Sequence, residues 1–300
     1  MDSNILVLSS GLQSSIQDLG RKGFRCYGVP ISGAMDKFSA ILANKLLNNA
    51  EGLPVMEMTC KGSNLFFEDE TSIVITGADL SPKLNGESVQ LNLVHKVKSG
   101  DVLNFGKLNF GSRAYLGVKG GFLTETKLNS KSYFQGITEK SNIKKGDRLR
   151  IAAYDPDFHA SASKLKVKKS HFKTKKIEVT KGPEFNRLTK RHRLILFNRE
   201  FTIDGLNNRM GYQIKNSFPT IGNSEIITSI IIPGTVQLTP SGKLIIMMRD
   251  CPTTGGYPRI LQLTDIAINQ LAQKRTGEKF KFELESSFSF LSRLISRFKD

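Results

Sequence analysis

Four stretches of the sequence combine residue types that can bind an anion or move a proton. The first is GVPISGAMD, residues 28–36, which carries Ser32 and Gly33 and ends on Asp36. Glycine lets a backbone approach a ligand closely, and a carboxylate can steer water or accept a proton. This loop is therefore a candidate for the lining of a functional cleft.

Asp36 also stands where a helix should begin. Apolar residues recur behind it at helical spacing, namely Phe38, Ile41, Leu42 and Leu46. A carboxylate at that N-cap accepts backbone N–H bonds and stabilises the helix by about 1 kcal/mol. The two roles do not exclude each other, because a capping residue can still face a cleft.

The second stretch, SIQDLGR at residues 15–21, brings together the amide of Gln17, the carboxylate of Asp18 and the guanidinium of Arg21. Its alternative is a surface loop with an Asp18–Arg21 ion pair, which contributes little to stability. The third stretch, NRMGY at residues 208–212, sets Arg209 beside a glycine. Arginine there is suited to bidentate recognition of a carboxylate or phosphate.

The fourth stretch, RDCPTTGGYP at residues 249–258, follows an apolar run and offers a second carboxylate, Asp250. Its hydroxyls and glycine amides, from Thr254 to Gly256, are suited to a nest for an anion or a developing oxyanion. A two-glycine hairpin turn is the alternative interpretation.

The composition limits the class of protein. The chain has 300 residues, 39% of them hydrophobic, and 26 glycines, which is normal for one large or two ordinary globular domains. No stretch is long and apolar enough to span a bilayer, and the N-terminus lacks a signal-peptide pattern. The three cysteines and four histidines lack the spacing of a disulfide framework or a metal site. We expect an unexported, cytoplasmic protein without a bound metal.

The net charge of +17 is locally concentrated, and residues 164–199 are strongly basic. Lys164, Lys166 and Lys168 alternate with apolar residues, which is typical of a lysine row that protects the edge of a sheet. Aromatic side chains that would stack on single-stranded nucleic acid do not interleave with these charges. We therefore expect no nucleic-acid partner.

Short runs with alternating apolar residues predict a mainly β fold with few helices. Asn85 and Gly86 lie between two such runs, which is a strong hairpin signal. Further strands are expected at residues 71–76, 101–105, 114–118, 149–152, 194–197, 226–232, 244–248 and 279–284. Short strands at hairpin spacing favour an antiparallel sandwich or barrel.

A repeated pattern of a turn followed by a strand divides the chain. The segments SGDVLNF (99–105), KGDRLRI (145–151) and TGEKFKF (276–282) share a glycine, an acid and alternating apolar positions, and the last two fit the closing strands of two successive β modules. With the polar stretch 154–164 between them, we expect an N-terminal domain at 1–158 and a C-terminal domain at 159–300. The tail, residues 286–300, is typical of an amphipathic segment that packs on its own domain.

Four segments of the chain carry a resemblance to a known family. They are SIQDLGRKGFRCYGVPISGAMDKFSAILANKLL, RMGYQI, PGTVQLTPSGKLIIMMRDCPTTGGYPRI and TDIAINQLAQKRTGEKFKF. They resemble the biotin-dependent carboxyltransferase-like family, which includes the C-type subunit of 5-oxoprolinase, allophanate hydrolase subunit 2 and the carboxyltransferase region of urea carboxylase. The resemblance covers nearly the whole chain and implies two cyclophilin-like β-barrel domains.

The resemblance also implies partners and chemistry. The expected function is that of the C-type subunit of an ATP-dependent 5-oxoprolinase, which hydrolyses 5-oxo-L-proline to L-glutamate together with A-type and B-type subunits and is inactive alone. Two alternatives stay open. One is a non-catalytic regulator that binds a B-type kinase-inhibitor partner, and the other is biotin-dependent carboxyl transfer to urea or a related amide.

ATP and biotin are expected to act from outside this chain. The P-loop pattern GxxxxGK[ST] is missing from the sequence, so ATP is assigned to the assembled complex. The tetrapeptide AMDK (34–37) is similar to the Ala-Met-Lys-Met of a biotin carrier, but Asp36 stands at the place of the modified lysine. Biotin is therefore not expected to be attached here.

Carried over position by position, the resemblance places a set of residues in the site. The catalytic candidates are Asp36, Arg209 and Asp250, and the substrate-binding candidates are Gln17, Asp18, Arg21, Ser32, Gly33, Asn44, Gln237, Thr254, Gly255, Gly256 and Tyr257. Arg209 and the amides of 254–256 are expected to hold a phosphate or oxyanion, and Asp36 or Asp250 to steer water. The chain departs from the family pattern at residues 130–133, at Gln213 and at Cys251, which bears on the substrate rather than on the fold.

Overall fold

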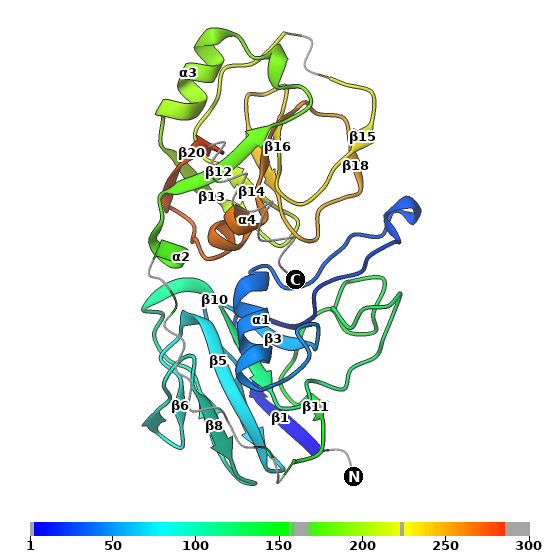
Figure 1. Ribbon diagram of the computed structural model, residues 1–300, viewed down its shortest axis with the longest axis vertical. Coiled ribbons are helices and arrows are strands. Elements are labelled where there is room, and N and C mark those ends of the chain that lie inside the picture. The colour runs from blue at the N-terminus through cyan, green and yellow to red at the C-terminus, as the bar shows by residue number, and fades with distance from the viewer. Residues whose placement is uncertain (1–2, 156–157, 159–166, 168–169, 223–224, 286–300) are drawn as a thin grey trace, which may run out of the picture. The chain divides into compact units, whose positions relative to one another are not determined.

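The computed structural model describes residues 3–155, 158, 167, 170–222 and 225–285. The chain forms two compact units (Figure 1). Unit 1 comprises Met1–Lys173 together with Ala272–Arg275, and unit 2 comprises Thr174–Leu271 and Thr276–Asp300. The division into units falls after Lys173, and the domain boundary that the sequence predicts near residue 158 stays a prediction.

Unit 1 is built from two sheets of mainly antiparallel strands. The six-stranded sheet has the order β11-β1-β4-β9-β6-β7, and the five-stranded sheet has the order β2-β3-β10-β5-β8. The strands are β1 (Ser3–Ser9), β2 (Gln13–Gln17), β3 (Val55–Thr59), β4 (Asn64–Phe67), β5 (Thr71–Asp79), β6 (Lys83–Leu84), β7 (Glu87–Ser88), β8 (Val94–Val97), β9 (Val102–Asn104), β10 (Phe110–Val118) and β11 (Arg148–Ile151). In the described part of this unit, three short helices accompany them, η1 (Arg25–Tyr27), α1 (Lys37–Leu46) and α2 (Ser170–Lys173).

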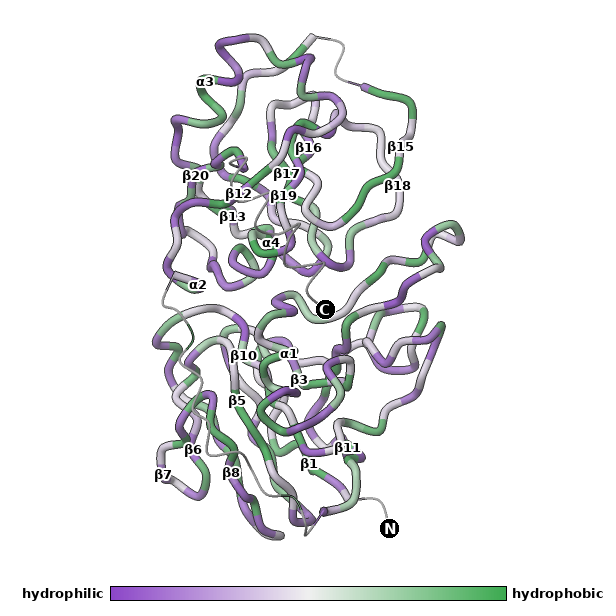
Figure 2. Tube along the Cα trace, in the orientation of Figure 1, coloured by the Kyte–Doolittle hydropathy of each residue, from purple (hydrophilic) through white to green (hydrophobic). Residues whose placement is uncertain are grey.

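The five-stranded sheet is buried on the side that carries α1. Strand β5 pairs with β10 at the centre of this sheet, and its middle is strongly hydrophobic (Figure 2). Helix α1 packs on β5 and β10 (Figure 1). Ala43 and Leu46 of the helix belong to one buried hydrophobic cluster with Val74 and Tyr115 of the sheet. This packing fixes the start of α1, and with it Asp36, against the sheet.

Unit 2 contains a closed barrel of seven strands in the order β12-β19-β16-β17-β14-β13-β20. Its strands are β12 (Lys176–Lys181), β13 (Phe201–Asn207), β14 (Gly211–Ile214), β16 (Thr235–Leu238), β17 (Leu244–Met247), β19 (Arg259–Leu263) and β20 (Lys279–Leu284). A separate two-stranded ribbon joins β15 (Ser229–Ile230) to β18 (Thr254–Gly255), and the helices are η2 (Phe185–Arg187), α3 (Lys190–Asn198) and α4 (Asp265–Ala272). Phe201, Phe280 and Phe282 pack ring against ring inside this unit.

Several local predictions are confirmed. Asp36 caps α1, and its side chain accepts a hydrogen bond from the backbone N–H of Ser39. Asn85 and Gly86 turn the β6–β7 hairpin with φ angles of 52° and 88°, the left-handed pair that a type I′ turn requires. The mainly β class with few short helices is also confirmed, and the closed barrel of unit 2 is one of the two barrels expected.

Two strand predictions are corrected. Residues 194–197 belong to helix α3, which begins at a capping box between Thr189 and His192. A capping box satisfies two backbone N–H groups at a helix start, so local capping outweighs the strand preference of Leu-Ile-Leu-Phe. Within 226–232, only Ser229–Ile230 forms a strand, because pairing with Thr254–Gly255 is that short.

Other expectations concern residues that the structure does not describe. The lysine row at 164–168 lies largely, and the amphipathic tail at 286–300 entirely, outside the described residues. In unit 1 the described strands form the two sheets above, so a second cyclophilin-like barrel stays a prediction. None of the helices in the described part of the chain is long and apolar enough to cross a membrane.

Candidate functional site

In unit 1 the candidate site centres on Asp36, whose side chain is completely buried. Oδ2 accepts hydrogen bonds from Ser39 Oγ at 2.7 Å, from His171 Nε2 at 2.7 Å and from Gln273 Nε2 at 2.8 Å. Oδ1 accepts from the backbone N–H of Ser39 at 3.2 Å. The donors around this buried carboxylate satisfy both of its oxygens by hydrogen bonding.

A second buried carboxylate lies directly behind this loop. Glu57 Oε2 accepts from the backbone N–H of Met35 at 2.7 Å and from Tyr115 Oη at 2.8 Å. Tyr115 Oη in turn accepts from the backbone N–H of Asp36 at 2.7 Å. Burial, together with the nearby charges of Glu57 and Asp36, holds the pKa of Tyr115 well above its usual value. Tyr115 therefore stays a neutral donor, and the backbone at 35–36 is held rigidly.

Gln273 ties the same loop to β10. Its Oε1 accepts from the backbone N–H groups of Ser112 and Arg113, each at 3.0 Å. Its Nε2 donates to Asp36 and, at 2.9 Å, to the carbonyl of Arg113. All the hydrogen-bonding capacity of this buried amide is thus used within unit 1. Because Gln273 is held by the backbone of β10, it holds Asp36 Oδ2 in place in turn.

Asp18 and Arg21, predicted as a possible ion pair, both bind the segment Ser130–Ser132. Asp18 Oδ1 accepts from Ser130 Oγ at 2.8 Å and Ser132 Oγ at 2.6 Å, and Oδ2 accepts from the backbone N–H of Lys131 at 2.6 Å. The guanidinium of Arg21 donates to the carbonyl of Ser132. Asp18 therefore organises the loop in which the chain departs from the family pattern.

The remaining unit 1 candidates have structural contacts. Gln17 is buried and donates to Ser15 and to the carbonyl of Tyr133. Asn44 donates to two carbonyls in the turn after α1, those of Glu51 at 3.1 Å and Leu53 at 2.7 Å. These two amides hold loops together, and their assignment as substrate contacts stays a prediction.

Ser32 and Gly33 both adopt left-handed backbone conformations, with φ angles of 57° and 86°. A Cβ at Gly33 would lie 2.8 Å from the backbone nitrogen of Gly20, so only glycine fits. Ser32 Oγ is buried and has no hydrogen-bond partner among the described residues. A strained, closely packed loop of this kind is typical of functional sites.

In unit 2, Arg209 and Asp250 form a buried bidentate ion pair. Arg209 Nε lies 2.8 Å from Asp250 Oδ2, and Nη2 lies 3.0 Å from Oδ1. Both residues are more than nine-tenths buried. The guanidinium predicted to bind an anion thus engages a carboxylate of the protein itself, and the two predicted catalytic residues of this unit act as one rigid group.

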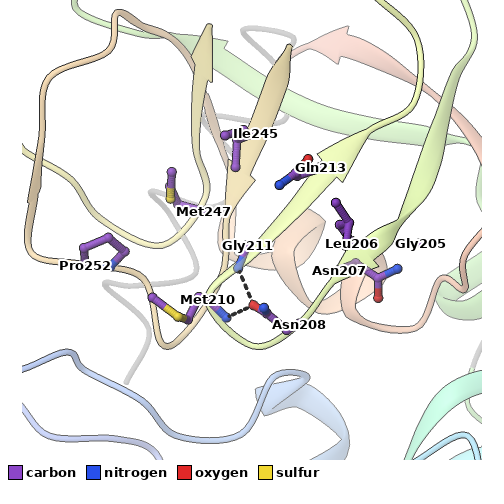
Figure 3. A pocket seen from close by; sticks show the side chains of 10 residues that line it. All are labelled: Gly205, Leu206, Asn207, Asn208, Met210, Gly211, Gln213, Ile245, Met247 and Pro252. Carbon is purple, nitrogen blue, oxygen red and sulfur yellow. Dashed lines mark hydrogen bonds between the residues drawn. The ribbon is translucent and has the colours of Figure 1, made fainter. Parts of the chain in front are cut away.

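Unit 2 contains a pocket of about 480 Å³, whose lining includes Met210, the residue that follows Arg209 (Figure 3). It is lined by Gly205, Leu206, Asn207, Asn208, Met210, Gly211, Gln213, Ile245, Met247 and Pro252. Asn208 Oδ1 accepts from the backbone N–H groups of Met210 at 2.8 Å and Gly211 at 3.2 Å, which shapes the rim. The side-chain amide of Gln213 makes no hydrogen bond to a described residue, so it is available to a ligand.

The predicted glycine nest is a strand. Thr254–Gly255 pairs with Ser229–Ile230, and the carbonyl of Gly256 accepts from the N–H of Ile226 at 3.0 Å. Gln237 Nε2 donates to the carbonyl of Tyr257 at 3.2 Å. A Cβ at Gly255 would lie 2.2 Å from Ile231 Cδ1, so glycine permits this close packing. Tyr257 is partly exposed at the end of the ribbon.

Sequence reasoning missed three residues of the Asp36 cluster, namely Glu57, His171 and Gln273. His171 and Gln273 lie 135 and 237 positions from Asp36. Gln273 belongs to the family-like segment TDIAINQLAQKRTGEKFKF, but nothing in that segment pairs it with Asp36. A buried acid within the apolar strand β3 was the available signal for Glu57. Among the described residues, no group of three or more His, Cys, Asp or Glu side chains is placed to hold a metal ion.

Comparison with known proteins places these observations in a family. The model of the family described as "Carboxyltransferase domain, subdomain A and B" matches residues 27–284. The chain is 32% identical over 286 residues to the C-type subunit of 5-oxoprolinase from Haemophilus influenzae, a match that covers 93% of this chain and 91% of that protein.

Two solved structures are similar over 94% of this chain. One is the K. lactis urea amidolyase, with a TM-score of 0.84 and 28% identity, and the other is TTHA0988, with a TM-score of 0.83 and 25% identity. The chain spans 19% of the first solved chain and 55% of the second. Most of the urea amidolyase therefore lies outside the matched region.

Proposed function

Because this chain belongs to the carboxyltransferase domain family, subdomains A and B, we propose that it is the C-type subunit of an ATP-dependent 5-oxoprolinase. In this proposal it opens 5-oxo-L-proline to L-glutamate together with A-type and B-type subunits in the cytoplasm. The observation that carries the proposal is the similarity to the C-type 5-oxoprolinase chain over 91% of that relative's length.

The unit 2 pocket supports a small amide as substrate. Its volume of about 480 Å³ is within the usual range for small-molecule sites. Its lining is largely apolar and includes the available amide of Gln213, and an amide can donate to the carbonyl and accept from the N–H of a lactam ring. The Arg209–Asp250 pair fixes the backbone at one side of this pocket.

The residues are assigned roles on this basis. Met210 and Gly211 form the pocket rim, and Gln213 binds the lactam amide. The Arg209–Asp250 pair is assigned the role of holding the rim residue Met210 in place, because Met210 follows Arg209 directly. ATP is assigned to the assembled complex. We also propose that both units are cyclophilin-like β-barrels.

Carboxyl transfer is the second candidate function, favoured by the description of the matching family. In that case the chain would act on urea or a related amide with a biotin carrier from another chain. A non-catalytic role, as the binder of a B-type partner, is the third outcome that an experiment must separate.

The test is reconstitution of this chain with its candidate A-type and B-type partners. Glutamate release from 5-oxo-L-proline and ATP is measured with all three chains, with this chain left out, and with avidin added. Release that needs this chain and is insensitive to avidin supports the proposal. Avidin-sensitive consumption of urea points to carboxyl transfer, and a stable complex without turnover points to regulation.

The pocket itself is tested with Gln213→Leu, which keeps the side-chain size and removes the amide. We expect the KM for 5-oxo-L-proline to rise about tenfold, the cost of one lost hydrogen bond of about 1 kcal/mol or slightly more. Gln135→Leu, at an exposed position of unit 1, serves as the matched control. An unchanged KM in Gln213→Leu would show that the Gln213 amide does not bind the substrate and would contradict the assignment of this pocket as the substrate site.

A further inference from the structure

A second pocket of unit 2 lies where α3 begins, and its lining differs from that of the pocket that contains Gln213. Its volume is about 530 Å³. The lining includes the polar or charged side chains of Arg187, Thr189, His192, Thr220 and Glu225. A pocket of this volume with so many polar side chains is suited to a small charged molecule.

The lining is held in place by contacts inside unit 2. At the capping box of α3, the side chain of Thr189 accepts from the backbone N–H of His192, and His192 Nδ1 accepts from the backbone N–H of Thr189 at 3.2 Å. The segment that leads into Thr220 is fixed by Phe218, whose backbone N–H donates to the carbonyl of Gly242 at 2.8 Å. The ring of Phe218 also packs on His192, with centroids 5.8 Å apart.

Two side chains of the lining offer hydrogen-bond donors to a ligand. Because His192 Nδ1 accepts a backbone hydrogen bond, the neutral ring carries its hydrogen on Nε2, and no described residue accepts that hydrogen. The guanidinium of Arg187 is exposed and makes no hydrogen bond or ion pair with a described residue. Its charge acts on Glu184, but that carboxylate is bonded to Arg259. Arg187 is therefore suited to bind a carboxylate of a ligand.

The charges around the pocket define the ligand further. Glu225 is exposed, and its carboxylate makes no hydrogen bond with a described residue, so it is suited to accept from an ammonium group. Lys190 and Arg191 are exposed in the first turn of α3, which contains no acidic residue, and they add positive charge beside Arg187. A ligand that complements these charges carries one ammonium and two carboxylates.

We propose that this pocket binds an α-amino acid with an acidic side chain. Glu225 accepts from the ammonium of the amino acid, and Arg187 and the Nε2 hydrogen of His192 bind its two carboxylates. The proposal goes beyond the proposed function and stands without it, because it rests on the pocket at the start of α3 alone.

Binding is measured by NMR of the full chain with carbon-13 in its threonine methyl groups. Thr220 lines the pocket, and Thr220→Ser assigns its signal because serine keeps the hydroxyl and lacks the methyl. We expect L-glutamate to shift the Thr220 signal with a Kd below about 10 mM and to leave the signal of Thr180 on β12 unchanged. L-Glutamate is also the product of the proposed reaction, so the signal is read at Thr220, which lies outside the lining of the other pocket. No shift at Thr220 overturns the proposal.

Two analogues test the charges that the ligand must carry. Glutarate has both carboxylates of L-glutamate and no ammonium, and L-glutamine has the ammonium and one carboxylate. We expect each to bind at least about tenfold more weakly than L-glutamate, because each leaves a charged group of the pocket without its partner. Glutarate that binds as tightly as L-glutamate would show a site for anions in general and would overturn the proposal. Equal binding of L-glutamine would overturn the acidic side chain.

Variants of the lining test the residues that bind the ligand. Arg187→Gln and Glu225→Gln each remove one charge and should each raise the Kd of L-glutamate about tenfold. Both side chains are exposed, so we expect both variants to keep the methyl spectrum of the folded chain. Lys215→Gln is the matched control, because Lys215 is an exposed cation of the same unit outside this lining. An unchanged Kd in both lining variants, or an equal rise in Lys215→Gln, overturns the proposal.

Discussion

Asp36 and His171 are 135 positions apart in the sequence, and Asp36 Oδ2 lies 2.7 Å from His171 Nε2 in unit 1. The same carboxylate caps α1 and accepts from Gln273. The sequence allows two interpretations of Asp36, as a helix cap or as a site residue. In the structure Asp36 is the cap of α1, and its Oδ2 also binds the partly exposed His171. The cap fixes the carboxylate, and the carboxylate fixes the imidazole.

The first prediction concerns this cap. Asp36→Ala removes the acceptor at the start of α1 and leaves the buried donors of Ser39 and Gln273 without their partner. We expect the free energy of unfolding to fall by about 3 kcal/mol, measured by urea unfolding. Asp36→Ser keeps a capping oxygen and should recover about 1 kcal/mol of that loss. The same loss in both variants would show that the cap contributes nothing.

The second prediction concerns the buried pair of Arg209 and Asp250. Removing either partner leaves an uncompensated buried charge, so Arg209→Ala and Asp250→Ala should each lower the free energy of unfolding by about 3–5 kcal/mol. The double variant should lose clearly less than the sum of the two, because it leaves no unpaired charge from this pair. Strict additivity in this double-mutant cycle would mean that the two side chains do not stabilise each other.

Structural features that form between neighbouring residues are easier to predict from the sequence than contacts between distant residues. The cap at Asp36 and the turn at Asn85 arise from neighbouring residues, so their sequence patterns were sufficient. The apolar run at 194–197 was assigned to a strand, because four residues carry too little periodicity to separate a strand from a buried helix segment. The start of α3 uses a histidine where capping boxes usually have glutamate or glutamine, which hid it.

The candidate site was predictable as motifs but not as contacts. Residue type pointed to Asp36, Arg209 and Asp250, yet the pairing of Arg209 with Asp250 across 41 positions depends on strand β14 pairing with β17. The contact from Gln273 to Asp36 spans 237 positions and has no local signal. Only the folded sheets bring such residues together.

The third prediction is a dependence of stability on pH. The hydrogen bonds from Arg259 hold the pKa of Glu184 below its ordinary value, with Nη2 to Oε1 at 2.8 Å and Nε to Oε2 at 3.0 Å. A carboxylate whose pKa is lowered by folding adds stability above its unfolded pKa and loses that contribution as the pH falls through its folded pKa. Glu184→Gln should therefore cost about 1–2 kcal/mol at pH 7 and progressively less below about pH 4.

Urea unfolding at several pH values provides the measurement for this pair. Glu87→Gln, at an exposed hairpin position, is the control and should match wild type at every pH. A penalty for Glu184→Gln that stays constant down to about pH 3 would contradict the assigned role of the charge.

The fourth prediction uses two glycines with nearly the same backbone angle. Gly33 and Gly136 have φ angles of 86° and 84°, but a Cβ at Gly33 would meet the backbone at Gly20, whereas one at Gly136 would meet nothing within 4 Å. Gly136→Ala should cost only the left-handed penalty of about 1 kcal/mol. Gly33→Ala should cost about 2 kcal/mol more, because the loop must shift. Equal thermal stability of the two variants would contradict the close packing of the Gly28–Asp36 loop.

The most direct test of the central claim is the rate of glutamate release from 5-oxo-L-proline and ATP in the reconstituted three-chain mixture, compared with the mixture that lacks this chain. If the chain has the proposed C-type role, its omission should lower the rate by at least about a hundredfold, the scale on which active-site groups contribute. Equal rates with and without the chain would contradict the account.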